Sequence, residues 1–160
     1  MFRISASAVL LFFVLLTSAE PQGRPAYLPN PKLTPGATRN VNKDEVCRPR
    51  QTSLGDDIPM ALKRQVFDRY GLGPNAPPGY NVDHLIPVGL GGSHSVENLW
   101  PQPLTGEWTH HQKNRLEHKL RQMVCNGEID LKTAQQEVAA DWCAAYKKYV
   151  ETSGKGRGQG

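Results

Sequence analysis

The fold of this chain is decided by one stretch of sequence, NVDHLIPVGLGGSHSVENLWPQPLTGEWTHHQKNRLEHKL, at residues 81–120. Two short segments with large apolar residues, 79–83 and 96–100, flank a loop at 85–95 that contains a proline and three glycines. A helical period of apolar residues follows at about 107–124. Short apolar runs bounded by turn residues predict strands, and a period near 3.6 predicts a helix. The stretch therefore predicts a strand, a long loop, a second strand and a helix.

Histidine is confined to this part of the chain. The five histidines are His84, His94, His110, His111 and His118. The first of them follows Asp83 directly, at the end of the first expected strand. A carboxylate suits a hard divalent ion such as Mg²⁺, and an imidazole suits a general base near neutral pH. Solvated surface histidine is the alternative for any single member, and we expect it for His94 and His118, but it does not account for the whole cluster.

The expected helix at 107–124 has two chemically different faces. At about 100° per residue, one face carries polar residues and the opposite face carries apolar ones. The polar face holds His111, Asn114, Arg115 and His118, and the apolar face holds Leu116, Leu120, Met123 and Val124. We expect the apolar face to pack, and the polar face to carry candidate ligands and a cation. An ordinary solvated face is the alternative.

Taken together, these residues resemble the HNH nuclease motif of the His-Me finger (ββα-metal) class. The resemblance rests on the segments 80–87, 91–92, 97–101 and 111–114, which contain Asp-His-x-x-Pro, Gly-Gly, Asn-Leu and a second His. His84, Asn98 and His111 stand in the order of the motif, with spacings of 14 and 13 residues.

The resemblance extends beyond the motif itself. The segments 34–38, 61–64 and 141–146, together with Cys47, are similar to those of exported bacterial proteins that carry this motif. It therefore covers roughly Thr34 to Val150. It implies an α+β fold, a small and mainly helical domain at 46–151 built around a ββα-metal hairpin and helix.

The family assigns roles to the matching positions. His84 would be the general base that activates water, and Asn98 would complete the catalytic set by holding the loop through hydrogen bonds. Asp83 and His111 would hold one divalent metal ion, with Asn114 as the competitor for the second position. Mg²⁺ is the expected ion, and Mn²⁺, Ni²⁺ and Zn²⁺ are the other candidates.

The implied activity is that of an exported, metal-dependent endonuclease acting on DNA, with RNA as the other candidate substrate. The chain carries 19 Lys and Arg against 15 Asp and Glu, a balance that tolerates an anionic partner. The cations expected to contact phosphates are Lys113, Arg115, Lys119 and Arg121. Two alternatives remain from the sequence: a nucleic-acid-binding protein on the same fold without catalysis, and an exported interaction protein in which the histidines are incidental.

The two ends of the chain have compositions of their own. Arg3, an apolar run at 8–16 and small residues up to Ala19 predict a signal peptide at 1–19, and hence a periplasmic or secreted protein without a membrane anchor after cleavage. Residues 20–45 predict an extended or flexible lead-in, and 152–160 a disordered tail.

The 160 residues suffice for one domain, and the composition excludes membrane, collagen-like and coiled-coil proteins. The oligomeric state is not indicated.

Two further helices and one disulfide are expected. Asp57 is the expected cap of a helix that ends at Gly71, and Asp130 is the expected cap of a helix that runs to Tyr149. The pairing of the three cysteines is open from the sequence alone. Cys143 lies in the last helical pattern, where a buried thiol is expected, so Cys47–Cys125 is the pairing expected by elimination.

Overall fold

The computed structural model describes residues 27–49, 57–73, 75 and 78–152. The expected signal peptide at 1–19 and all of the expected tail except Thr152 lie outside these residues. Among the described residues, no helix is long and apolar enough to cross a membrane.

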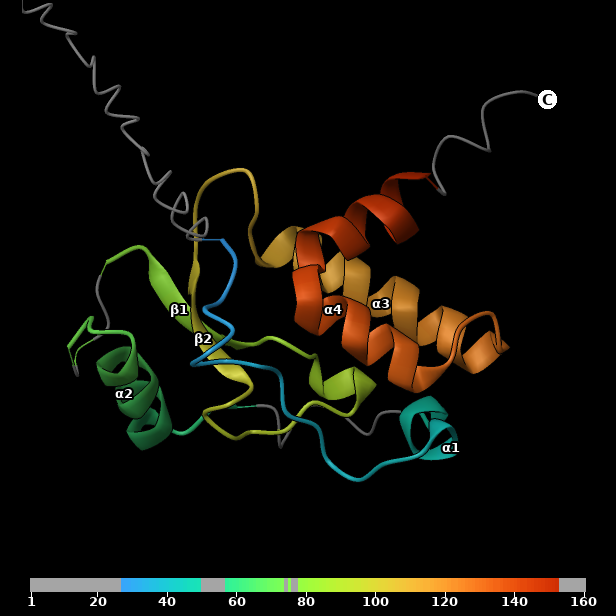
Figure 1. The fold of residues 1–160 in the computed structure, drawn as a ribbon, viewed down its shortest axis with the longest axis horizontal. Coiled ribbons are helices and arrows are strands. Elements are labelled where there is room, and N and C mark those ends of the chain that lie inside the picture. The colour runs from blue at the N-terminus through green and yellow to red at the C-terminus, as the bar shows by residue number, and fades with distance from the viewer. Residues whose placement is uncertain (1–26, 50–56, 74, 76–77, 153–160) are drawn as a thin grey trace, which may run out of the picture.

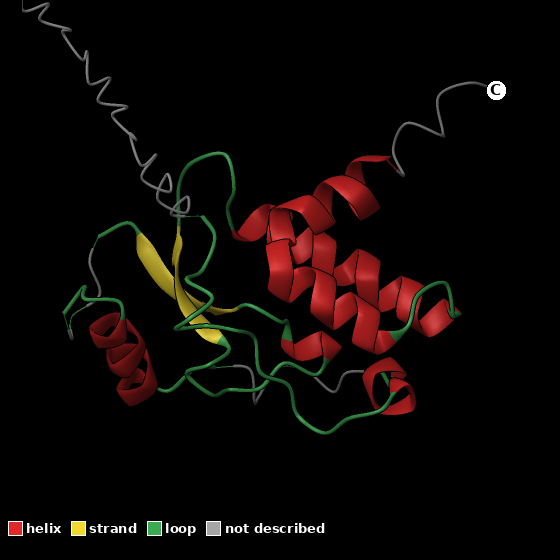
Figure 2. Cartoon of the chain, in the orientation of Figure 1, coloured by secondary structure: helices red, strands yellow, loops and turns green. Residues whose placement is uncertain are grey.

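A two-stranded antiparallel sheet lies between helices (Figure 1). Strand β1 spans Tyr80–His84 and strand β2 spans Leu99–Pro103. Helix α2, at Met60–Arg69, lies on one side of this hairpin, and helices α3, at His110–Asn126, and α4, at Leu131–Tyr146, lie on the other (Figure 2). The mixture of helices with an antiparallel sheet confirms the expected α+β class.

The second strand begins three residues later than expected. Residues 95–98 form a turn instead, in which the amide of Asn98 donates to the carbonyl of Ser95 over 2.9 Å. The antiparallel register then pairs His84 with Leu99 and Tyr80 with Pro103. The short apolar run correctly predicted a strand here, but the first residues of the expected segment 96–100 belong to the turn.

The two faces of the hairpin contribute to two apolar clusters. Val82 and Leu99 pack with Val66 and Phe67 of α2. Trp100, on the opposite face of β2, joins the larger core formed with α3 and α4. The buried members of this core on α3 and α4 include Leu116, Leu120, Val124, Val138 and Trp142. Because successive strand residues point to opposite faces, one short hairpin can support both clusters.

Helix α2 begins differently from the expectation. The N-cap position is occupied by Pro59, which makes no side-chain capping bond, so the expected capping by Asp57 is wrong. Proline fixes φ near the helical value, here −56°, and needs no amide partner at a helix start. The end of the helix agrees with the sequence, because Gly71 follows it with a φ of +69°.

Helix α3 has a well-defined start. The hydroxyl of Thr109 accepts from the amide of His111 over 3.4 Å, and Gln112 Oε1 accepts from the amide of Thr109 over 3.1 Å. This capping box starts the helix at His110, three residues after the expected Glu107.

Helix α4 is interrupted near its end. It begins after Asp130 as expected, although the Asp130 side chain makes no capping bond. Within it, Asp141 has non-helical backbone angles of φ −162° and ψ 97°. Asp141 Oδ1 accepts from the amides of Cys143 and Ala144 at 3.0 and 2.9 Å and so caps the part that follows. The continuous helix expected up to Tyr149 is therefore wrong, and a π-helical turn at Lys147–Glu151 follows α4.

Residues 27–47, which include most of the expected lead-in, lie along the hairpin and α3. The Thr34 hydroxyl donates to the Leu99 carbonyl over 2.8 Å, and Thr38 forms an isolated antiparallel bridge with Gly92. A short helix, α1, spans Lys43–Cys47. Cys47 and Cys125 form a disulfide that joins α1 to α3, which confirms the pairing expected by elimination, and Cys143 is buried and is not part of the disulfide.

Candidate functional site

The long loop between the strands is closed by Asn98. Its side chain is fully buried. Asn98 Oδ1 accepts from the amide of Ile86, and Nδ2 donates to the carbonyls of Ile86 and Ser93, each over 2.9 Å. The Asn98 carbonyl also accepts from the amide of Leu85 over 2.7 Å. Because Leu85 follows His84 directly, these bonds fix the end of β1.

The inside of the loop leaves no room for a side chain at Gly92. A Cβ atom at this position would lie 1.8 Å from the Ile86 carbonyl oxygen and 2.8 Å from Asn98 Nδ2. The one-turn 3₁₀ helix η1, at Val88–Leu90, lets the chain turn back toward this contact. Gly92 is thus explained by the close approach of the loop to Asn98, whereas Gly91 has a φ of +84° and a Cβ there would lie 2.4 Å from Val41 Cγ2.

His84 is buried at the end of β1, with 6 % of its surface exposed. Its Nε2 lies 3.2 Å from Nδ1 of His94, and the two rings meet edge to face with centroids 4.8 Å apart. Its Nδ1 lies 4.0 Å from Oδ1 of Asp83. The expectation that His94 is solvated is therefore wrong: it is half-buried and contacts the ring of His84.

Asp83 faces helix α3, and the residue that meets it there is Lys113. The distance from Lys113 Nζ to Asp83 Oδ2 is 3.2 Å. The Lys113 side chain is 3 % exposed, whereas that of Asp83 is 32 % exposed. Although neighbours on a strand point to opposite faces, Asp83 and His84 stand at the strand end, where both reach one region. The site thus combines a carboxylate, two imidazoles and a buried ammonium group.

The two candidate second ligands of a metal lie at the surface of α3. His111 and Asn114 are both exposed. The His111 ring lies against His110, with centroids 3.9 Å apart, and Nδ1 of His110 is buried without a hydrogen-bond partner among the described residues. Among the described residues, no group of three or more His, Cys, Asp and Glu side chains is close enough to hold a metal ion.

The predicted phosphate-binding cations are used in different ways. Arg115 is exposed, with its guanidinium carbon 5.9 Å from the centre of the Tyr146 ring, and Lys119 is half-buried. Arg121 donates to the carbonyls of Val46 and Arg48, over 3.0 and 2.8 Å. Lys113 is buried against Asp83, as described above. Of the four, Arg115 is thus the one that the structure leaves most accessible to a phosphate.

One ion pair connects α2 to the turn before β2. Arg69 Nη1 lies 3.7 Å from Glu97 Oε1. A hydrogen bond from its own backbone amide and one from Ser95 lower the pKa of the exposed Glu97 carboxyl, and Arg69 adds to this effect. Glu97 directly precedes Asn98 in the sequence, so the ion pair joins α2 to the turn that contains Asn98.

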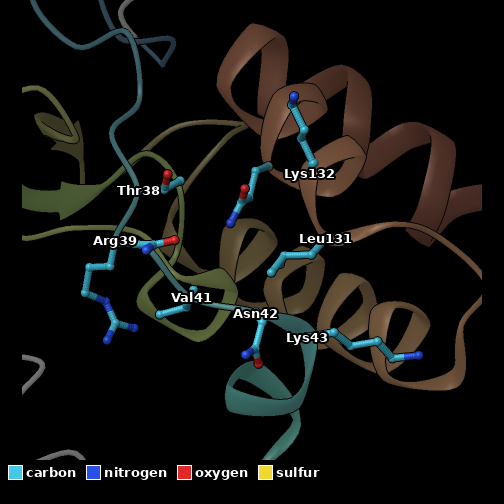
Figure 3. Close-up of a pocket in the computed structure, with 9 residues that line it drawn as sticks. Thr38, Arg39, Val41, Asn42, Lys43, Leu131 and Lys132 are labelled. Carbon is cyan, nitrogen blue, oxygen red and sulfur yellow. The ribbon is translucent and has the colours of Figure 1, made fainter.

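A basic pocket lies away from the predicted site residues. It measures about 590 Å³ and lies between residues 38–43 and the start of α4. Arg39, Lys43 and Lys132 line it, but Figure 3 shows that their charged ends point in three different directions. The cations do not converge on one point, as a phosphate site would require.

Sequence reasoning named His94 and Lys113 but placed both wrongly, His94 as solvated and Lys113 as a phosphate contact. The fold-back at Gly91-Gly92 is the signal that could have placed His94 near His84. The helical spacing of Lys113 with Leu116 and Leu120, which points all three inward, is the signal that could have placed Lys113. No family model, curated protein or solved structure matches this chain.

Proposed function

We propose that this protein is an exported, metal-dependent endonuclease of the HNH type that hydrolyses phosphodiester bonds of DNA. The observation that carries the proposal is the end of β1, where Asp83 and His84 stand together beside the start of α3. A strand, a loop closed by a buried asparagine, a second strand and a helix surround them. The ββα-metal motif has the same order of elements. The proposed phosphodiester hydrolysis is the activity that the sequence resemblance implies.

His84 is the proposed general base. Its imidazole removes a proton from a water molecule, which attacks the phosphorus atom as the ester bond to the leaving oxygen breaks. The hydrogen bond to His94 holds the ring in one orientation, and Asn98 holds the backbone that carries it. Such positioning matters because proton transfer requires the base within hydrogen-bond reach of the water.

The proposed metal site is built on one carboxylate. Asp83 offers a partly exposed carboxylate, and His111 and Asn114 are the candidates for a second ligand. Mg²⁺ is bound in many enzymes by one or two carboxylates plus waters, so it remains the proposed ion, ahead of Mn²⁺, Ni²⁺ and Zn²⁺. When bound, the ion would stabilise the negative charge of the phosphorane and the leaving oxygen.

The disulfide supports an extracytoplasmic location. Disulfides persist in the periplasm and outside the cell, and are rare in the cytosol. The Cys47–Cys125 bond therefore agrees with a periplasmic or secreted protein. DNA is the proposed partner, with RNA as the other candidate, and Arg115 and Lys119 are the proposed phosphate contacts on α3.

A second candidate function is nucleic-acid binding without catalysis. The observation that favours it is the ion pair of Lys113 with Asp83, which neutralises the one carboxylate at the centre of the site. Such a protein would bind through its cations, and its affinity would fall steeply with salt. Its binding would not require a divalent ion.

The two functions are separated by a plasmid assay on the mature chain from Glu20. Supercoiled plasmid is incubated with the protein in Mg²⁺, and in Mg²⁺ with excess chelator. The endonuclease predicts nicked and linear plasmid only in the first sample. Retarded but intact plasmid in both samples would favour the binding protein and contradict the endonuclease.

A further inference from the structure

We propose that Lys113 is the resident cation of this site, and that its ammonium group competes with a divalent ion for the Asp83 carboxylate. The inference rests on the proposed function for its metal, and on the contact between Lys113 and Asp83 for its geometry. It makes Lys113 a competitor of the metal rather than a phosphate contact.

The first observation is the burial of Lys113. Lysine side chains are almost never fully buried unless they are paired. Lys113 is 3 % exposed, and its ammonium group lies 3.2 Å from Asp83 Oδ2. An unpaired ammonium group at such a position would be costly. Asp83 is therefore the counter-ion on which the burial of Lys113 depends.

The second observation is the position of Lys113 on the buried face of α3. The Thr109 capping box starts the helix, and the amide of Lys113 donates to the Thr109 carbonyl over 3.3 Å. Lys113 then shares its face with the buried residues Leu116 and Leu120, at helical spacings of three and seven. Its neighbours His111 and Asn114 lie on the exposed side. The helix therefore presents a lysine, and not a metal ligand, to the carboxylate.

Two cations on one carboxylate repel each other. A divalent ion at Asp83 would sit close to the Lys113 ammonium group, and charges this close interact strongly at a partly buried site. If Lys113 moves away instead, its buried ammonium group loses its counter-ion. Either outcome weakens metal binding, so removing the charge of Lys113 should strengthen it.

The test uses Lys113→Met in the mature chain, because methionine keeps most of the length and loses the charge. Binding of Mn²⁺ is measured in the absence of nucleic acid, by electron paramagnetic resonance of the free ion. We expect Lys113→Met to bind Mn²⁺ at least about tenfold more tightly than the wild type. Circular dichroism confirms folding, and Lys113→Gln replaces Lys113→Met if the latter does not fold.

Two control variants make the result specific. Lys132→Met removes an exposed charge from α4, and we expect it to leave Mn²⁺ affinity unchanged. The double variant Asp83→Asn/Lys113→Met removes the proposed ligand, and we expect it to lose the gain. A gain that survives in the double variant would place the metal elsewhere and overturn the proposal.

Equal or weaker Mn²⁺ binding by Lys113→Met, or no binding by either protein, would also overturn the proposal. Plasmid cleavage is measured separately on the same samples. Tighter Mn²⁺ binding without any cleavage would keep Lys113 as the competitor and contradict the endonuclease. If the wild type cleaves plasmid but Lys113→Met binds Mn²⁺ no more tightly, the result would support the endonuclease and overturn the role of Lys113 as a competitor.

Discussion

At the scale of single residues, every polar atom of the Asn98 side chain is engaged with the loop between the strands. Asn98 therefore acts on His84 through the backbone, whereas His94 acts on it directly through the ring. With its backbone and its ring both held, the His84 side chain has few other orientations available. Both residues are positioning residues for the proposed base.

His94→Phe is predicted to lower the cleavage rate by about tenfold or more, because partners that orient a functional histidine commonly have effects of this size. The loss should fall on kcat rather than on KM, since the proposed role of His94 is to orient the base and not to bind substrate. His94→Asn, which can still offer a hydrogen bond, should recover part of the rate. Steady-state cleavage of a labelled duplex measures both constants.

An unchanged kcat in a folded His94→Phe protein would show that His94 does not orient the base. A uniform loss in both variants, accompanied by a lower melting temperature, would indicate a purely structural role for His94.

The same scale shows where sequence reasoning reaches its limit. The resemblance implies loop bonds for Asn98, and its side chain makes such bonds. Lys113 was expected at the surface as a phosphate contact, but it is buried against Asp83. A helical wheel gives the relative angles of side chains, but not how the helix is rotated toward the hairpin. That rotation depends on packing between segments that are distant in the sequence.

At the scale of elements, short-range patterns predicted the kinds of element well and their ends less well. The order of strand, loop, strand and helix follows from apolar spacing, and the structure has it. The break at Asp141 was missed because its neighbours keep the apolar helical period on both sides. A capping aspartate inside a helical pattern competes with the helix through its own hydrogen bonds.

The Cys47–Cys125 disulfide joins two helices, α1 and α3, whose cysteines lie 78 residues apart. A bond that closes so long a loop restricts the unfolded chain, and its removal typically costs about 2–4 kcal/mol. The double variant Cys47→Ala/Cys125→Ala should therefore unfold at a lower urea concentration than the wild type. Urea titration followed by tryptophan fluorescence measures the difference.

Cys143→Ala provides the matched control, because it removes a thiol that is not in the disulfide. If the double variant were as stable as the wild type, the link between α1 and α3 would contribute nothing to the free energy of unfolding.

At the scale of the whole molecule, only part of the positive charge is available to a nucleic acid. Arg115 is exposed on α3, whereas Arg121 holds the backbone at Val46 and Arg48. Arg115→Gln is predicted to weaken DNA binding several-fold and to reduce its salt dependence by about one phosphate contact. The stability of that variant should be unchanged.

Arg121→Gln is predicted to behave in the opposite way, because it removes hydrogen bonds from a charged group to backbone carbonyls. We expect it to lower the free energy of unfolding by about 1–3 kcal/mol and to change DNA affinity less than Arg115→Gln does. Fluorescence anisotropy at several salt concentrations and urea titration separate the two effects. If Arg121→Gln weakened DNA binding and Arg115→Gln lowered the free energy of unfolding, the assignment of Arg115 to DNA and of Arg121 to the fold would be wrong.

The central claim is that His84 is the base of a hydrolytic site, and the rate of plasmid cleavage in Mg²⁺ tests it most directly. Three mature proteins are compared: the wild type, His84→Ala, and His118→Ala, which removes an exposed histidine from α3. We predict that the wild type and His118→Ala convert supercoiled plasmid at similar rates, while His84→Ala is slower by at least about a hundredfold. Equal cleavage by folded His84→Ala and wild-type protein would contradict the claim.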